Sequence, residues 1–288
     1  MNVATSHTHL VGGARRLDGG RVRSVAGRLV GDRRRSILWW TLGLLGLALF
    51  VIAFYPSIEG DDSFDEVMES LPESFQTLSG VSEGISISSP AGYLNSQYFS
   101  NMFPILLLVF GIGAGAAAIA GSESDGTLEQ LLTEPVTRRE VAVGRWLGVA
   151  GLVVLLTALG GVAVLAPAPL VGLLDGLSVV DLLAATAGVG VLAVLHMSIA
   201  FGVGAATGRK GVALGAASAV AFGGYLLYGL AESAEALNGL RLASPWYWFL
   251  GAEPLAEGFT VMLLVPGLLL ALLVPIVGLW RFERRDLS

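Results

Sequence analysis

His196 is the one readily titratable side chain deep inside a long apolar run, with Ser198 two residues later and Ser218 in the next apolar run. An intramembrane hydrolase uses serine and histidine together, since the imidazole takes the proton of the attacking hydroxyl. Nothing in the sequence supplies an evident oxyanion hole, and a histidine packed between helices explains the residue more simply. We therefore predict a packing role for His196 and no catalytic residues, with a Ser/His hydrolase as the less favoured alternative.

The sequence lacks the groups that bind nucleotides and metals. A phosphate-binding loop ends in Gly-Lys-Ser/Thr, whereas the single lysine, Lys210, stands in Gly-Arg-Lys-Gly. There is no cysteine, which excludes disulfides, thiolate catalysis and cysteine-based metal sites. We therefore predict no metal site and no cofactor in this chain, so any nucleotide site must come from another polypeptide.

Two further kinds of function find little support in the apolar runs. Ion-coupled carriers place Asp or Glu within their spans, and none of the 23 acidic residues lies well inside a run, which weakens the alternative of a secondary transporter. Gly111, Gly113 and Gly115 resemble half of a dinucleotide fingerprint, but no strand precedes them. We predict that these glycines bring helices close together, as do Gly211 and Gly215.

The segment 121–145 is a charged stretch between two apolar runs. Thr127 and Gln130 have the spacing of a capping box, which predicts that a short helix begins there. Three leucines share one face of this helix and form a small apolar knob: Leu128, Leu131 and Leu132. The knob is expected to lie in water in the isolated chain, so that its apolar area is buried only when a partner binds.

A second helix is predicted directly after the first. Pro135 ends the short helix, and Thr137 and Glu140 repeat the capping-box spacing. The second helix should therefore begin at Arg138 and continue into the next apolar run. Two helices thus meet at a sharp corner in the middle of the segment.

The order of residues from Glu123 to Arg145 resembles the cytoplasmic loop of ABC type-2 transporter permeases: acid-x-acid-Gly-Thr-Leu-Glu, Leu-Leu, Pro-Val-Thr-Arg-x-Glu and Gly-Arg. The resemblance implies that the loop docks into a groove on a separate ATPase subunit, which binds the ATP and Mg. It also implies a second permease copy or a related permease as partner. The ATPase-coupling residues implied are Glu123, Asp125, Gly126, Thr127, Leu128, Glu129, Leu131, Leu132, Pro135, Arg138 and Glu140.

The composition is that of a membrane protein. Of the 288 residues 54% are hydrophobic and 14% charged, and the mean hydropathy is +0.72, whereas soluble domains carry about 25% charged residues. The charges cluster between runs long enough to cross the bilayer. The six predicted spans are residues 36–55, 99–121, 146–166, 182–207, 211–231 and 258–280.

Charge distribution predicts the orientation of these spans. Of the 17 basic residues, 16 lie before the first span, in the segment 121–145, at positions 209–210 or after the last span, and Arg241 alone lies on the other side. Basic residues favour the cytoplasmic side, so we expect both termini to be cytoplasmic in a multi-pass protein of the plasma membrane.

Two regions divide the chain. Residues 1–35 should form a tail and, from Arg21, an amphipathic helix at the membrane interface. Residues 36–288 should form the permease domain. Its outer loop 56–98 holds eight acidic residues and no Lys or Arg, with apolar spacing that predicts a short helix, while the outer segment 232–257 suggests broken helices. For the latter the resemblance implies a re-entrant pair.

We therefore expect an all-α membrane protein with six transmembrane helices, an N-terminal interfacial amphipathic helix and a cytoplasmic coupling helix. The resemblance implies the permease subunit of an ATP-driven exporter. Spans without charged residues favour a lipophilic or drug-like substrate. Membrane lipid is an expected partner, and nucleic acid is not.

Overall fold

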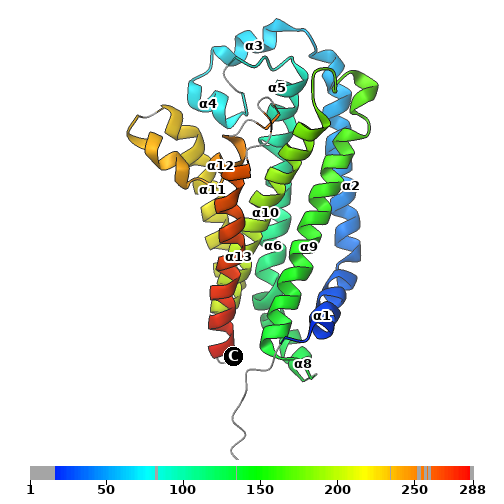
Figure 1. The fold of residues 1–288 in the computed structure, drawn as a ribbon, viewed down its shortest axis with the longest axis vertical. Coiled ribbons are helices and arrows are strands. Elements are labelled where there is room, and N and C mark those ends of the chain that lie inside the picture. Colours follow the sequence, from blue (N-terminus) through cyan, green and yellow to red (C-terminus); the bar gives the residue numbers. More distant parts are fainter. Residues whose placement is uncertain are drawn as a thin grey trace, which may run out of the picture.

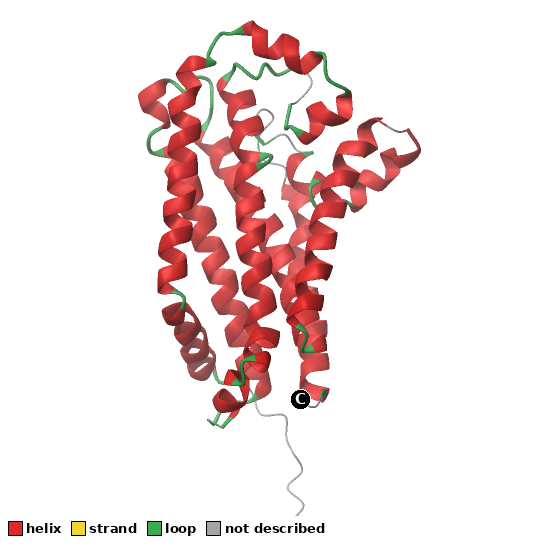
Figure 2. Ribbon diagram, turned by 180° about the vertical axis from the view of Figure 1, so that it is seen from behind, coloured by secondary structure: helices red, strands yellow, loops and turns green. Residues whose placement is uncertain are grey.

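The computed structural model describes residues 17–81, 84–133, 135–233, 235–251, 254–255, 258 and 261–285. Every regular element in these ranges is a helix (Figure 2), and six of the helices are long and apolar enough to cross a membrane. The predicted all-α fold with six spans is therefore confirmed.

The six long helices stand side by side and form an upright bundle (Figure 1). They are α2 (Arg34–Phe54), α6 (Met102–Ala116), α9 (Arg138–Leu165), α10 (Val179–Thr207), α11 (Lys210–Ser233) and α13 (Val261–Arg284). The second span is longer than predicted. It starts with α5 (Pro90–Leu94) and the π-helix η2 (Asn95–Phe99), and it continues after α6 through the π-helix η3 (Ala117–Gly121) and α7 (Ser122–Ser124).

Short helices lie at both ends of the bundle. They are α1 (Gly19–Asp32), η1 (Tyr55–Ser57), α3 (Asp62–Glu69), α4 (Glu73–Leu78), α8 (Thr127–Leu132), η4 (Ala168–Val171), η5 (Glu235–Ala243) and α12 (Tyr247–Leu250). We call the end with α1, α8 and the last turn of α13 the basic end. The opposite end, with α3 and α4, is the acidic end (Figure 1).

Three helices form the interior of the bundle and three its outside. In an apolar 18-residue stretch of the spans that contain α6, α9 and α10, 67%, 56% and 67% of the residues are buried. In the corresponding stretches of α2, α11 and α13, only 22%, 22% and 28% are buried. The ring of Tyr98 stacks on that of Phe103 in the same span, with the centroids 4.8 Å apart. The Tyr98 hydroxyl donates to the Gly160 carbonyl of α9 at 3.1 Å, which joins two of the inner helices. The outer helices leave broad apolar faces for lipid or another protein.

The glycines in the spans do not all act as predicted. A Cβ on Gly115 would lie 2.4 Å from the Met197 carbonyl oxygen, and one on Gly111 would lie 3.3 Å from the Ala193 carbonyl oxygen. Close packing of α6 against α10 is therefore confirmed. For Gly113, Gly211 and Gly215 the prediction is wrong within this chain, because nothing in the described structure lies within 4 Å of a Cβ built there.

The predicted helices outside the bundle are present. In α1 the side chains of Val22 and Val25 are buried, and they pack beside Gly144 of α9. In the segment 56–98, α3 covers the stretch where apolar spacing predicts a helix. The segment 232–257 contains η5 and α12, which fits the broken helices expected there, while the re-entrant arrangement stays a prediction.

Candidate functional site

The segment 121–145 lies at the basic end, where it connects the end of the second span to α9 (Figure 1). Helix α8 begins at Thr127 and α9 begins at Arg138, as predicted. Gly126 makes the turn before α8 with a φ of +69°, a conformation that glycine adopts without strain. The predicted corner between a short and a long helix is thus present.

The Thr137–Glu140 capping box is present, and it does more than cap α9. The Thr137 hydroxyl accepts from the Glu140 amide at 3.2 Å, and the Glu140 carboxylate accepts from the Thr137 amide at 2.8 Å. The same carboxylate accepts from the Asp18 amide at 3.1 Å and lies 3.9 Å from the Arg21 guanidinium. Glu140 therefore also attaches α1 to α9, a role that its local spacing did not reveal.

Of the capping box predicted at Thr127 and Gln130, the structure describes only the Thr127 side chain. The Thr127 hydroxyl donates to the Ser122 carbonyl at 3.2 Å, which links α8 to the first residue of α7. The side chains of Glu129, Gln130 and Leu132 lie outside the described residues. Their predicted contributions to the cap and to the leucine face therefore stay predictions.

The leucine face of α8 points toward the bundle. Leu128 is 0% exposed and belongs to the central apolar core, and Leu131 is partly buried against it. The expectation that the Leu128 side chain lies in water in the isolated chain is therefore wrong. A six-residue helix is barely stable alone, so its apolar face packs against the nearest apolar surface. The exposed residues of this segment are Ser124, Asp125, Gly126, Thr127, Thr133, Pro135 and Arg139.

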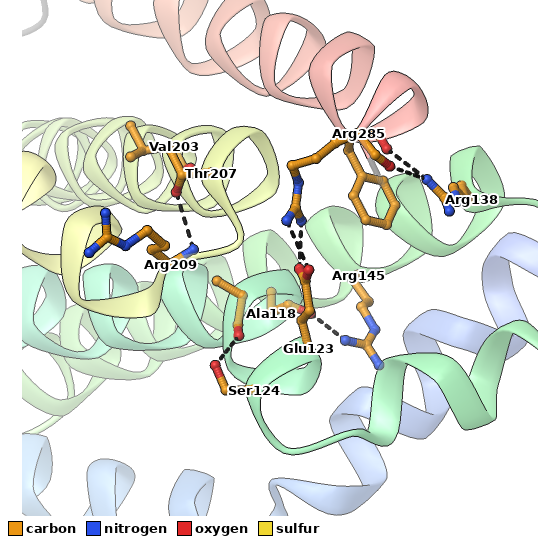
Figure 3. Close-up of polar contacts among 11 residues, drawn as sticks. Ala118, Glu123, Ser124, Arg138, Arg145, Val203, Thr207, Arg209 and Arg285 are labelled. Carbon is orange, nitrogen blue, oxygen red and sulfur yellow. Dashed lines mark hydrogen bonds and ion pairs between the residues drawn. The ribbon is translucent and has the colours of Figure 1, made fainter. Parts of the chain in front are cut away.

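Glu123 forms a bidentate ion pair with Arg285, which follows α13 (Figure 3). The two guanidinium nitrogens lie 2.8 and 2.5 Å from the two carboxylate oxygens, and the Glu123 side chain is only 7% exposed. Gly208, between α10 and α11, has a φ of +68°, and a Cβ there would lie 2.2 Å from Arg285 Nη1. The ion pair thus joins α7, the α10–α11 turn and the end of α13.

Arg138 reinforces the same junction from α9. Its Nη1 donates to the Arg285 carbonyl at 2.6 Å and to the Phe282 carbonyl at 3.4 Å (Figure 3), and its guanidinium lies 5.8 Å from the Phe282 ring centroid. A cation at the carboxyl end of a helix stabilises its unpaired carbonyls. We call Glu123, Arg138 and Arg285 the basic-end latch.

Two arginines of the latch region have roles that sequence reasoning missed. Arg285 gave only a weak signal, as one of three basic residues after the last span, since 162 residues separate it from Glu123. Arg145 donates from Nη1 to the Ala118 carbonyl in η3 (Figure 3). A π-helix leaves carbonyls without their usual partners, and Arg145 pairs one of them.

The serine and histidine of the apolar runs do not form a catalytic pair. The His196 ring is fully buried, and its Nδ1 bonds to the Leu192 carbonyl at 2.8 Å within α10. The Ser198 hydroxyl accepts from the Trp146 indole at 3.0 Å, and Ser218 lines a cavity on α11. Among the described residues, no three His, Asp or Glu side chains are grouped as ligands for a metal.

Among the cavities lined by described residues, three are relevant to function. One of about 450 Å³ is at the basic end between α1, η3, α8 and α9. A second, of about 600 Å³, lies between α6 and α11 and is almost entirely apolar, with Leu108, Ile112 and Phe222 in its walls. A third, of about 670 Å³, lies beneath α3 and α4 and shares Ile105 and Tyr225 with the second. The second and third cavities therefore adjoin.

Comparison with known families gives one result that covers almost the whole chain. Residues 24–287 match the family described as ABC-2 family transporter protein. Comparison with curated proteins gives no match. The match includes all six spans and the segment 121–145. The chain therefore belongs to the ABC-2 family of transporter proteins, membrane subunits that associate with an ABC ATPase.

Proposed function

We propose that this chain is the permease of an ATP-driven exporter that moves a lipophilic or drug-like substrate outward. The observation that carries the proposal is the apolar cavity between α6 and α11, in a protein of the ABC-2 family. Its volume of about 600 Å³ is in the range of cavities that enclose drug-sized ligands. The energy then comes from a separate ATPase, which binds the ATP and Mg.

The lining of this cavity supports an apolar substrate. No ionisable acid or base other than a tyrosine stands among its described lining residues. The polar atoms of two of them are already engaged, since the Tyr225 hydroxyl donates to the Leu78 carbonyl at 2.7 Å and the Trp246 indole donates to the Ala221 carbonyl at 2.9 Å. Ser218 is left to bond a polar group of the substrate. A charged substrate would lose its hydration without compensation.

The direction of transport follows from the adjoining cavities and the orientation of the chain. The basic residues favour a cytoplasmic basic end, with both termini inside and the acidic end outside the plasma membrane. A substrate that leaves the α6–α11 cavity past Ile105 and Tyr225 then reaches the cavity beneath α3 and α4. That path leads outward.

The coupling to ATP hydrolysis is assigned to the basic end. Since Leu128 packs inward, the ATPase would contact the exposed side of the segment, which includes Asp125, Gly126 and Thr127. Force applied there reaches α13 through Glu123 and Arg285, and α9 through Arg138. The remaining coupling residues, from Glu129 to Glu140, would either contact the ATPase or hold this surface in place.

The outer helices are assigned to contact with a second permease, either another copy or a related subunit. Large apolar side chains are exposed along α2, α11 and α13, including Phe50, Phe222 and Ile276. Exposed apolar surface at bilayer depth faces either lipid or protein. The α6–α11 cavity opens on the outside of the helix bundle, so a second permease packed there would close it.

Filling the α6–α11 cavity tests the proposed function. Gly113 lines the cavity and a Cβ there meets nothing within 4 Å, so the side chain of Gly113→Leu can begin without a clash and occupy cavity space. In vesicles that contain this permease and its ATPase, we expect ATP-dependent accumulation of a lipophilic fluorescent dye to fall about tenfold. ATP hydrolysis without dye should continue, because the basic end is unchanged.

The matched control is Gly151→Leu. Gly151 is an exposed glycine of α9 with the same open space around it, outside the lining of the three cavities. It should leave dye accumulation unchanged. Normal accumulation by Gly113→Leu in a complex that assembles would refute the assignment of this cavity to the substrate.

A further inference from the structure

The cavity at the basic end combines charge with apolar surface. Its volume is about 450 Å³, and α1, η3, α8 and α9 enclose it. Val25, Leu29 and Leu131 give it apolar walls, and three arginines line it together with a single carboxylate: Arg28, Arg33, Arg145 and Asp32. The described lining residues therefore carry a net positive formal charge.

Arg33 and Arg145 place two positive charges beside the one carboxylate among the described lining residues of the cavity. The guanidinium groups of Arg33 and Arg145 repel each other, and the one carboxylate of the cavity, Asp32, is exposed. Burial lowers the pKa of Arg33, with Asp32 partly opposing the effect, but a guanidinium stays charged in proteins. Two cations that share one partly buried cavity favour an anion between them.

Hydrogen-bond donors for such an anion are already in place. The Arg33 side chain has no hydrogen bond to the described part of the chain, so its whole guanidinium group is available. Arg145 uses Nη1 for the Ala118 carbonyl and keeps its other N–H groups. The Ser122 side chain lines the same cavity and adds a hydroxyl. Guanidinium groups bind phosphate oxygens in pairs of parallel hydrogen bonds.

The position of the cavity identifies the source of the anion. Arg33 immediately precedes α2, the first span, and Trp39 lies 71% exposed less than two turns further along. Tryptophan side chains mark the headgroup region of a bilayer, so Arg33 lies near the depth of lipid phosphates. Val25 and Leu29, on the amphipathic helix α1, supply the apolar contact that acyl chains require.

We propose that this cavity binds the phosphate of an anionic phospholipid from the leaflet that meets the basic end. The phosphate lies between Arg33 and Arg145, and the start of the acyl chains lies along Val25 and Leu29. The bound lipid connects α1 to α8, so it holds the interfacial helix against the segment 121–145. A free phosphate ion shares the headgroup chemistry but lacks the acyl contact.

The test is a lipid titration of the full-length protein in a neutral detergent. The thermal unfolding midpoint is followed as dioctanoyl phosphatidylglycerol is added, and in parallel with dioctanoyl phosphatidylcholine or inorganic phosphate at equal concentrations. We expect a saturable rise with phosphatidylglycerol only. An equal rise with inorganic phosphate would overturn the assignment to lipid, and an equal rise with phosphatidylcholine would overturn the requirement for negative charge.

The variant Arg33→Gln tests whether phosphatidylglycerol binds in this cavity. The change removes one charged partner of the phosphate, so the apparent affinity for phosphatidylglycerol should fall about tenfold. Arg23→Gln is the control, since Arg23 is an exposed residue of the neighbouring helix α1 outside the cavity lining. Unchanged affinity in Arg33→Gln, or an equal loss in Arg23→Gln, would show that lipid binds elsewhere and refute the site.

Discussion

The two ends of the bundle are held together by different chemistry. At the basic end, charged side chains join helices that are distant in the sequence, as in the Glu123–Arg285 pair 162 residues apart. At the acidic end, carboxylates bond to nearby groups, as when Asp65 accepts from the Ile87 amide at 2.7 Å and from the Ser86 hydroxyl at 2.6 Å. A long-range contact there, from the Tyr225 hydroxyl to the Leu78 carbonyl, is neutral.

This difference has mechanical consequences. A buried ion pair is costly to break, because each charge is left without a partner, whereas a neutral hydrogen bond contributes about 1 kcal/mol. The basic end should therefore move as one body when a partner pushes on it, and the acidic end should open locally. The proposed exporter would need both a stiff end that receives force and an opposite end that opens for the substrate.

Arg285→Ala should have the largest effect on stability. It leaves the nearly buried Glu123 carboxylate without its guanidinium, which we expect to lower the free energy of unfolding by about 3 kcal/mol. Unfolding in mixed detergent micelles measures the change. Arg281→Ala, at an exposed position of α13, is the control, and an equal effect of the two would mean that the latch adds nothing.

Leu128→Ala should have the second-largest effect on the free energy of unfolding. Leu128 is fully buried, but α8 is short and can settle into the space left behind, so the expected loss is about 2 kcal/mol, at the low end for a buried leucine. Leu147→Ala, an outward-facing leucine of α9, should cost much less in the same unfolding assay. If Leu128→Ala kept full stability and only lost the ATPase, Leu128 would belong to the docking surface after all.

Local sequence signals were enough for some of the elements at each end. Apolar run length gave the six spans, and the spacing of Thr137 and Glu140 gave the start of α9 together with its cap. Such signals work because a helix start depends on residues three or four positions apart. The helix α3 in the acidic loop followed from the same periodicity.

What the sequence did not predict is which partner each surface meets. The periodicity of Leu128 and Leu131 identified a shared face, but the same pattern fits a face that packs on the bundle and one that packs on another protein. Likewise, the acid motif marked Glu123 without indicating Arg285, since pairing across 162 residues depends on how the helices pack. The prediction for Gly113, Gly211 and Gly215 failed for the same reason, because small residues do not specify their neighbour.

The smallest expected effect lies at the acidic end. Asp65→Ala removes the acceptor for the Ile87 amide and the Ser86 hydroxyl, which should cost about 1 kcal/mol in a partly exposed loop. The loss of stability should stay local, because no hydrogen bond of Asp65 within the described residues reaches one of the six long helices. Amide hydrogen exchange at Ile87 should therefore quicken about fivefold, while the global unfolding free energy hardly changes.

Glu66→Ala is the matched control for Asp65→Ala. Glu66 is the adjacent acidic residue on α3 and its side chain is exposed, so the exchange rate at Ile87 should stay as in the unchanged protein. A global loss of stability with Asp65→Ala as large as that with Arg285→Ala would contradict the contrast between the two ends. The acidic end would then also transmit strain to the whole bundle, and the substrate would have to leave without local opening of the outer loop.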